Sequence, residues 1–152
     1  MITVSDNDSA ITLYEHMGHD QVENFLKDYG FNDSSFLSPP KTTPNDSATF
    51  FEKLYKGQIV NREFSQKMLD VLFRQRLNDR LPKYLPLGTH VAHKTGELDT
   101  FKHDAGIVQY QGNDDYLIVV MTDTPDPENA AEITAQISKD VFDYFKNKKQ
   151  SI

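Results

Sequence analysis

The fold is decided by residues 89–122, which read THVAHKTGELDTFKHDAGIVQYQGNDDYLIVVMT. Three segments of this stretch, 89–95, 105–111 and 116–122, are short and rich in β-branched and aromatic residues, a composition typical of β-strands. The last two are separated by Gly112-Asn113-Asp114-Asp115, whose residues favour a hairpin turn. The stretch therefore predicts a three-stranded antiparallel sheet.

Helices are predicted on both sides of these strands. Four precede them, each indicated by apolar residues three and four positions apart and by a cap or a glycine stop. The signals are a stop at Gly18, a capping box at Asp20 and Glu23 with a stop at Gly30, a start at Thr43-Pro44 with a stop at Gly57, and a cap at Asn61. The apolar side of the fourth helix holds Phe64, Met68, Val71 and Leu72. A closing helix from about Pro127 to Lys146 carries, along one side, Ile133, Ile137, Val141 and Tyr144.

The order of these elements gives the fold class. Four helices, three antiparallel strands and one helix make an α+β fold, because the strands are not separated by helices as they are in a βαβ arrangement. The length of 152 residues fits one domain. We expect that domain to span 1–152, with a helical region at 5–87 and the sheet plus closing helix at 88–152.

Composition excludes several classes of partner and site. A net charge of −7 makes nucleic acid a poor partner, since an acidic chain does not release counterions from a phosphate backbone. No membrane partner is expected, because the chain has neither a run of 18 apolar residues nor a basic amphipathic stripe. The absence of cysteine excludes disulfides, thiol catalysis and Cys-based zinc sites. Residues 1–6 lack the basic and apolar regions of a signal peptide, so no export signal is expected in the chain as written.

Two short motifs carry chemically useful side chains. Ser5-Asp6-Asn7 opens the first predicted helix, and Lys94-Thr95-Gly96-Glu97 lies at the end of the first predicted strand. Each also has a plain structural interpretation, because Ser, Asp and Asn are strong helix caps and Lys-Thr-Gly suits a strand that enters a turn. Their order is the more specific signal, since only helices and loops are predicted between them.

That order resembles the class A β-lactamases and related penicillin-binding serine hydrolases, whose motifs are Ser-x-x-Lys, Ser-Asp-Asn and Lys-Thr-Gly. The similarity continues along the chain, through Thr42-Thr43-Pro44 before a helix that ends in Lys56-Gly57, then His103-Asp104-Ala105-Gly106-Ile107-Val108 as a strand, then 116–122 and the closing helix. The resemblance implies a partial β-lactamase/transpeptidase-like fold.

The resemblance also implies two catalytic roles in acyl transfer, which requires an activated hydroxyl, a proton route and donors for the oxyanion. Ser5 would be the hydroxyl that relays a proton. Lys94 would polarise Ser5 and supply positive charge near the substrate carboxylate. An acidic chain that binds an anionic substrate needs such a local cation.

Four further residues would bind the substrate, which the family implies to be a β-lactam or a peptidoglycan-like small molecule. Asn7 would bind the amide side chain of the substrate, and Thr95 its carboxylate. Gly96 would allow the substrate to approach the strand closely. The backbone N–H of Glu97 would be one of two hydrogen-bond donors to the oxyanion. The family implies no cofactor and an exported parent protein of the Gram-positive type.

Two departures from the family pattern predict that the chain is inactive alone. The Ser-x-x-Lys nucleophile, which lies upstream of Ser-Asp-Asn in the family, is missing from this sequence. The one literal match, Ser38-Pro39-Pro40-Lys41, lies in a proline-rich loop, where Ser and Lys need not share a helical face. Between Gly30 and Thr43 the chain has Asp33 but no glutamate to activate a deacylating water.

Other hypotheses remain open from the sequence. The chain could be a non-catalytic ligand- or partner-binding module that keeps the carboxylate-binding Lys-Thr-Gly strand, or an unrelated α+β domain with two accidental motifs. No metal site is predicted, because His90 and His93 would face opposite sides of a strand. The apolar segment 116–122 predicts an exposed sheet edge that pairs with a second copy or with an N-terminal fragment.

Overall fold

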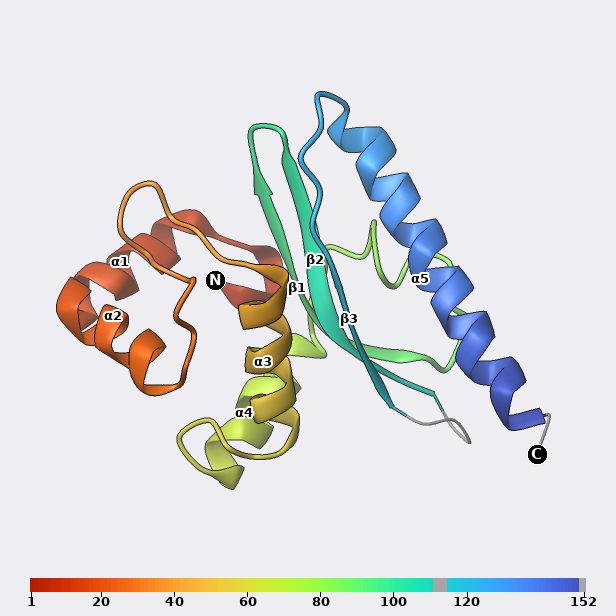
Figure 1. The fold of residues 1–152 in the computed structure, drawn as a ribbon, viewed down its shortest axis with the longest axis horizontal. Coiled ribbons are helices and arrows are strands. Elements are labelled where there is room, and N and C mark those ends of the chain that lie inside the picture. Colours follow the sequence, from red (N-terminus) through yellow and green to blue (C-terminus); the bar gives the residue numbers. More distant parts are fainter. Residues whose placement is uncertain (111–114, 151–152) are drawn as a thin grey trace.

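The computed structural model describes residues 1–110 and 115–150, and Figure 1 shows their arrangement. A short 3-10 helix, η1 (Ile2–Val4), precedes four α-helices. These are α1 (Asn7–Met17), α2 (His19–Asp28), α3 (Pro44–Tyr55) and α4 (Arg62–Leu72). The strands and the closing helix follow as β1 (His90–Leu98), β2 (Phe101–Gln109), β3 (Tyr116–Val120) and α5 (Pro127–Gln150). This order confirms the predicted α+β class, with a helical region, a three-stranded sheet and a C-terminal helix.

The sheet is antiparallel throughout, with the strand order β1-β2-β3. The first two strands are longer than predicted, since β1 continues to Leu98 and β2 starts at Phe101. The turn expected directly after Lys94-Thr95-Gly96 lies farther along, at Asp99-Thr100, where Asp99 adopts the left-handed conformation with φ 49°. The turn predicted at Gly112-Asn113-Asp114-Asp115 includes residues 112–114, which lie outside the described residues.

Each face of the sheet has its own apolar core. Helices α3 and α4 cover one face, and α5 covers the other (Figure 1). The first core comprises buried residues of the helical region and of β1 and β2, among them Phe51, Leu54, Leu72, Ala92 and Ile107. The second joins the sheet to α5 and to the segment before β1, through Leu81, Val91, Val108, Tyr116, Ile118 and Phe142. The sheet therefore connects the helical region to the closing helix.

Local capping explains most helix boundaries. Thr43 Oγ1 accepts a hydrogen bond from Asp46 N at the start of α3, and Asn61 Oδ1 accepts one from Phe64 N at the start of α4, as predicted. The capping box predicted for α2 is wrong. Gly18 occupies the N-cap position of α2, and Glu23 instead accepts a hydrogen bond from Phe36 N in the following loop.

The apolar faces of two helices differ from those predicted. In α4 the buried residues are Ser65, Leu69 and Leu72, whereas Phe64 is 48% exposed. In α5 the sheet contacts mainly small side chains, since the buried residues are Ala130, Ala131, Thr134, Ala135, Ser138 and Phe142. Small residues allow a helix to lie close to a sheet, and they carry too little hydrophobicity to dominate a periodicity analysis. Within residues 1–110 and 115–150, no helix combines the length and apolar character that crossing a membrane requires.

Close packing between β2 and β1 fixes the strand that carries Lys94. Gly106 lies opposite His93 in the register of the two strands. A Cβ atom on Gly106 would lie only 2.6 Å from both the carbonyl oxygen of Ala92 and Cβ of His93. Packing within the chain therefore requires glycine at this position.

Substituting Gly106→Ala should lower the free energy of unfolding by about 1–3 kcal/mol, because the added methyl group overlaps β1. The matched control is Gly96→Ala on β1, whose Cβ would lie 3.5 Å from its nearest neighbour, His103 Cβ, and should cost far less. Urea unfolding monitored by circular dichroism measures both effects. Equal losses for the two variants would contradict the register described here.

Candidate functional site

The two sequence motifs meet at a single hydrogen bond. Lys94 Nζ lies 2.7 Å from Ser5 Oγ and donates to it, although the two residues are 89 positions apart in the sequence. The same ammonium group also donates to the carbonyl oxygen of Thr95, at 2.6 Å. A hydroxyl that accepts from a lysine keeps its own proton available for donation to another group. The pair thus has the geometry that a proton relay beside a cation requires.

The position of Ser5 depends on the segment that follows α4. The carbonyl oxygens of Ile2 and Thr3 in η1 accept hydrogen bonds from Gln75 Nε2 and Arg76 N, at 3.0 and 2.9 Å. Ser5 follows η1 directly and adopts the left-handed conformation, with φ 53° and ψ 42°. A serine held in this sparsely populated conformation costs free energy, and such residues cluster at functional sites.

The rest of the first motif starts α1. Asp6 is the N-cap, and its carboxylate accepts a hydrogen bond from Ser9 N. Hydrogen bonding to the side chain of Ser9, and then to its backbone N–H, lowers the pKa of Asp6. Asn7 is the first residue of the helix, and it is exposed. The capping interpretation of this motif is therefore correct for Asp6, while Ser5 makes the contact to Lys94.

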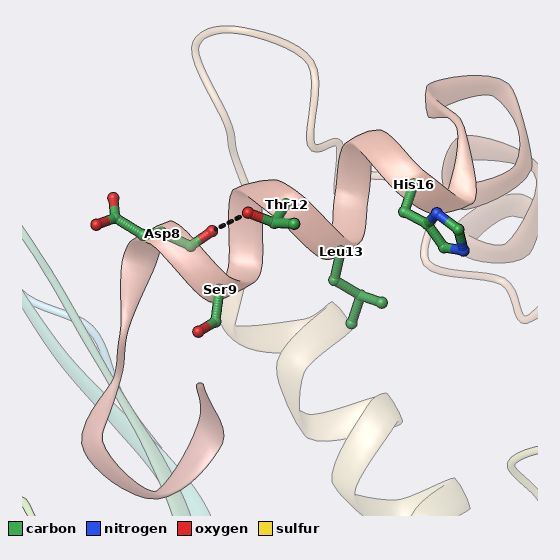
Figure 2. Close-up of a pocket in the computed structure, with 5 residues that line it drawn as sticks. All are labelled: Asp8, Ser9, Thr12, Leu13 and His16. Carbon is green, nitrogen blue, oxygen red and sulfur yellow. Dashed lines mark hydrogen bonds between the residues drawn. The ribbon is translucent and has the colours of Figure 1, made fainter.

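The outer surface of α1 is open. None of its residues is buried, and the exposed side chains include Ile11, Leu13 and Met17. Figure 2 shows an open depression along one side of the helix, lined by Asp8, Ser9, Thr12, Leu13 and His16. The depression includes neither Ser5 nor Lys94, so it is separate from the contact between the two motifs.

Lys94 is a half-buried cation in the middle of β1. Burial lowers its pKa, because a charged group loses hydration there, and the positive charge of Arg80 lowers it further. The negative charge of Asp104 acts in the opposite direction and raises the pKa. Lys94 therefore loses its proton more readily than an exposed lysine does.

The remaining residues of the second motif lie along the outer edge of the sheet, because β1 pairs only with β2 among the described strands. Thr95 is 4% exposed, and its side chain leaves the strand on the side opposite to that of Lys94. A ligand lying along the free edge of β1 could contact both residues. At Gly96, packing within the chain leaves room for a methyl group, so any requirement for glycine there comes from a ligand.

Arg80 is a buried arginine beside the second motif, and no sequence pattern predicted its role. Its side chain is 2% exposed. Its Nη1 donates to His103 O at 2.9 Å, and its Nη2 donates to Glu97 Oε2 at 2.6 Å. Lys102 also donates to Glu97, and this hydrogen bond, together with the charge of Arg80, lowers the pKa of Glu97. The only sequence signal was a single arginine between two predicted elements, which is too common to interpret.

A second buried polar group, also not identified from sequence, lies directly beside Lys94. His93 is 1% exposed, and its Nδ1 lies 2.9 Å from Asp104 Oδ1. Its Nε2 lies 3.1 Å from Asn78 Oδ1, and Asp104 accepts a further hydrogen bond from Leu81 N. These contacts tie β1 to β2 and to the segment before the sheet, so they hold the backbone from which Lys94 projects.

The loop between α2 and α3 is held by a buried aspartate. Asp46 is 4% exposed and accepts hydrogen bonds from Asp33 N and Ser34 Oγ, at 2.9 and 2.8 Å. Ser38 and Lys41 are both exposed. They lie in a loop closed by the backbone pairing of Ser35 with Lys41, and not on a helix. Their arrangement is unlike that of a helical Ser-x-x-Lys pair.

Potential metal ligands are dispersed. His90 is exposed and His93 is buried, so the two do not share a side of β1. In the part of the chain that the structure describes, no three His, Asp or Glu residues form a group that could hold a metal ion.

Comparison with known proteins identifies the family. Residues 1–145 match the profile described as the Beta-lactamase enzyme family. The chain is 27% identical over 165 aligned positions to β-lactamase BRO-1 of Moraxella catarrhalis, and the match covers 95% of this chain and 53% of BRO-1. The chain therefore spans about half the length of this curated relative.

Solved structures show the same relationship. The protein PBP-A superimposes with a TM-score of 0.89 at 27% identity, over 97% of this chain and 59% of PBP-A. The TLA-3 extended-spectrum β-lactamase superimposes with a TM-score of 0.82 at 27% identity, over 92% of this chain and 60% of that enzyme. The protein belongs to the β-lactamase enzyme family and corresponds to a part of the family's fold.

Proposed function

We propose that this chain provides the proton-relay and carboxylate-binding part of an acyl-transfer site for β-lactams or peptidoglycan stem peptides. The observation that carries the proposal is the 2.7 Å hydrogen bond between Lys94 and Ser5. Family membership supports it, as does the description of a PBP-A variant as an acyl-enzyme complex with penicillin G. In this proposal Ser5 and Lys94 are the catalytic residues.

Charge at the site favours an anionic ligand. The chain as a whole carries a net charge of −7. At the free edge of β1, however, Lys94 lies close enough to the buried Arg80 for the positive charge of Arg80 to lower the pKa of Lys94. A local cation in a partly desolvated position attracts a carboxylate more strongly than it would in water. Thr95 and Gly96 on the edge strand, and Asn7 at the start of α1, are the proposed substrate-binding residues, together with the backbone N–H of Glu97.

The chain alone is proposed to bind such ligands without forming a covalent bond to them. Acylation requires a nucleophile that a neighbouring base or a lowered pKa activates. Ser5 accepts from an ammonium group, which cannot remove its proton while charged. Ser38 and Lys41 are exposed in a loop. The activated serine of the site is therefore proposed to come from a different segment.

Incubation with benzylpenicillin should leave the intact mass of the chain unchanged, while calorimetry should detect reversible binding. Lys94→Ala should weaken that binding by about tenfold or more, because a hydrogen bond to a charged group contributes about 1.5–3 kcal/mol. The matched control is Lys67→Ala, at an exposed lysine in an i,i+4 ion pair on α4, and it should bind normally. A penicilloyl adduct, or equal affinities for all three proteins, would contradict the proposal.

The pH dependence of binding follows from the lowered pKa of Lys94. The ammonium form binds the carboxylate, so affinity should fall as the pH rises through this pKa, at a lower pH than the value of about 10.4 for an unperturbed lysine. Lys94→Arg should keep its charge and retain its own affinity to higher pH. Calorimetric titrations with benzylpenicillin between neutral pH and about pH 10.5 measure both curves. Identical pH profiles for the two proteins would exclude Lys94 as the titrating cation.

A further inference from the structure

The side chain of His103 lies on the same side of the sheet as the contact between Lys94 and Ser5. Gly96 on β1 and His103 on β2 are partners in the register of the two strands, and directly paired residues point to the same face of a sheet. Lys94 and Gly96 are two positions apart on β1, so they also share a face. The imidazole ring of His103 therefore faces the side on which Lys94 donates to Ser5.

A hydrogen bond from the segment after β3 fixes the tautomer of this ring. Nδ1 of His103 accepts a hydrogen bond from Thr122 N, at 3.1 Å. A ring nitrogen that accepts from a backbone N–H carries no proton, so the neutral ring carries its proton on Nε2. Burial lowers the pKa of His103, the backbone of Lys102 and the charge of Asp123 raise it in part, and the charge of Arg80 lowers it further. With its pKa below the ordinary value of about 6.5, the ring is neutral at neutral pH.

The donor on Nε2 is not used within the described part of the chain. There His103 Nε2 makes no hydrogen bond, and it is not among the fully buried side-chain atoms. Cδ2, the ring carbon bonded to Nε2, would lie 3.7 Å from a Cβ atom placed on Gly96, whereas Nδ1 on the other side of the ring faces Thr122. Because Gly96 has no side chain, the Cδ2 and Nε2 side of the ring is open toward β1.

We propose that His103 is a further ligand-binding residue, whose Nε2–H donates a hydrogen bond to an acceptor oxygen of the ligand where the ligand crosses Gly96. The inference rests on the proposed function, since it places the ligand carboxylate at Lys94. Gly96 lies about 7 Å from Lys94 along the strand, so the acceptor at His103 belongs to a different part of the ligand. In benzylpenicillin the oxygens outside the carboxylate are carbonyl oxygens, and one of these is the expected acceptor.

Two substitutions separate binding of a ligand from the structural bond to Thr122. In His103→Asn the side-chain oxygen takes the position of Nδ1 and still accepts from Thr122 N, but no donor remains at the position of Nε2. In His103→Gln the side-chain amide places a donor at the position of Nε2, but the acceptor for Thr122 N is lost. A ligand contact and a purely structural role therefore predict opposite effects for the two variants.

Calorimetry with benzylpenicillin and urea unfolding measure the two effects. His103→Asn should bind about two- to tenfold more weakly than the wild type, the range expected for one neutral hydrogen bond, and should keep the wild-type urea midpoint. His103→Gln should bind with nearly the wild-type affinity and unfold at a lower urea concentration. The matched control is His90→Asn, at an exposed histidine that starts the same strand, and it should bind and unfold like the wild type.

Nitrogen-15 NMR of the His103 ring tests the tautomer without any ligand. At neutral pH, Nδ1 should resonate as an unprotonated nitrogen and Nε2 as a protonated one. Addition of benzylpenicillin should then shift the Nε2 and Nε2–H resonances, because the donor gains an acceptor. The same resonances of the control residue His90 should not move.

The outcomes distinguish this inference from the proposed function. If the wild type binds benzylpenicillin and His103→Asn binds it equally well, His103 does not contact the ligand, and the proposed function stands. A proton on Nδ1 in the ligand-free spectrum would likewise overturn the inference alone. Weakened binding by His103→Gln with normal binding by His103→Asn would reduce His103 to a structural role. Absence of binding by the wild type would contradict the proposed function and, with it, this inference.

Discussion

The hydrogen bond between Lys94 and Ser5 is the interaction on which the arrangement of the site depends. It joins the start of the helical region to the middle of an edge strand. Three separate conditions make it possible: η1 is bound to the segment that follows α4, Ser5 adopts a left-handed conformation, and β1 is held in register by its pairing with β2. The first and third conditions also depend on residues outside the proposed site, such as Gln75, Arg76 and Gly106, so the geometry of the site is a property of the fold as a whole.

Burial of a cation at this position has a free-energy cost, and neighbouring polar groups offset part of it. Asp104 favours the charged form of Lys94, while Arg80 opposes it. The charge of Arg80 is in turn balanced by Glu97, which also binds Lys102. Such networks stabilise a single arrangement when their members are satisfied. Arg80 also pairs with Asp79, so among the described residues Lys94 is the cation of this network that makes no ion pair, and such a cation suits an anionic ligand.

The sequence was sufficient to predict the fold class and the order of four helices, three strands and a closing helix, because caps, glycine stops and strand composition act locally, although it did not predict η1. The contact between the two motifs was expected only from the resemblance to the family. It was not sufficient for the faces of α4 and α5, where Ser65 and several small residues are buried through tertiary packing. Nor could it identify Arg80 and His93, whose importance comes from burial and from contacts with residues distant in the chain. The roles of Ser5, Asn7, Lys94, Thr95, Gly96 and Glu97 in catalysis and binding remain predictions.

The open surface of α1 agrees with the fact that the chain spans only part of its relatives. A double-mutant cycle on the free energy of unfolding, with Ser5→Ala, Lys94→Met and the double variant, tests the contact between Ser5 and Lys94 most directly. We expect the two substitutions to be non-additive, with a coupling of about 0.5–3 kcal/mol, as for residues in direct contact. Additivity to within about 0.3–0.5 kcal/mol, as for independent sites, would contradict the contact.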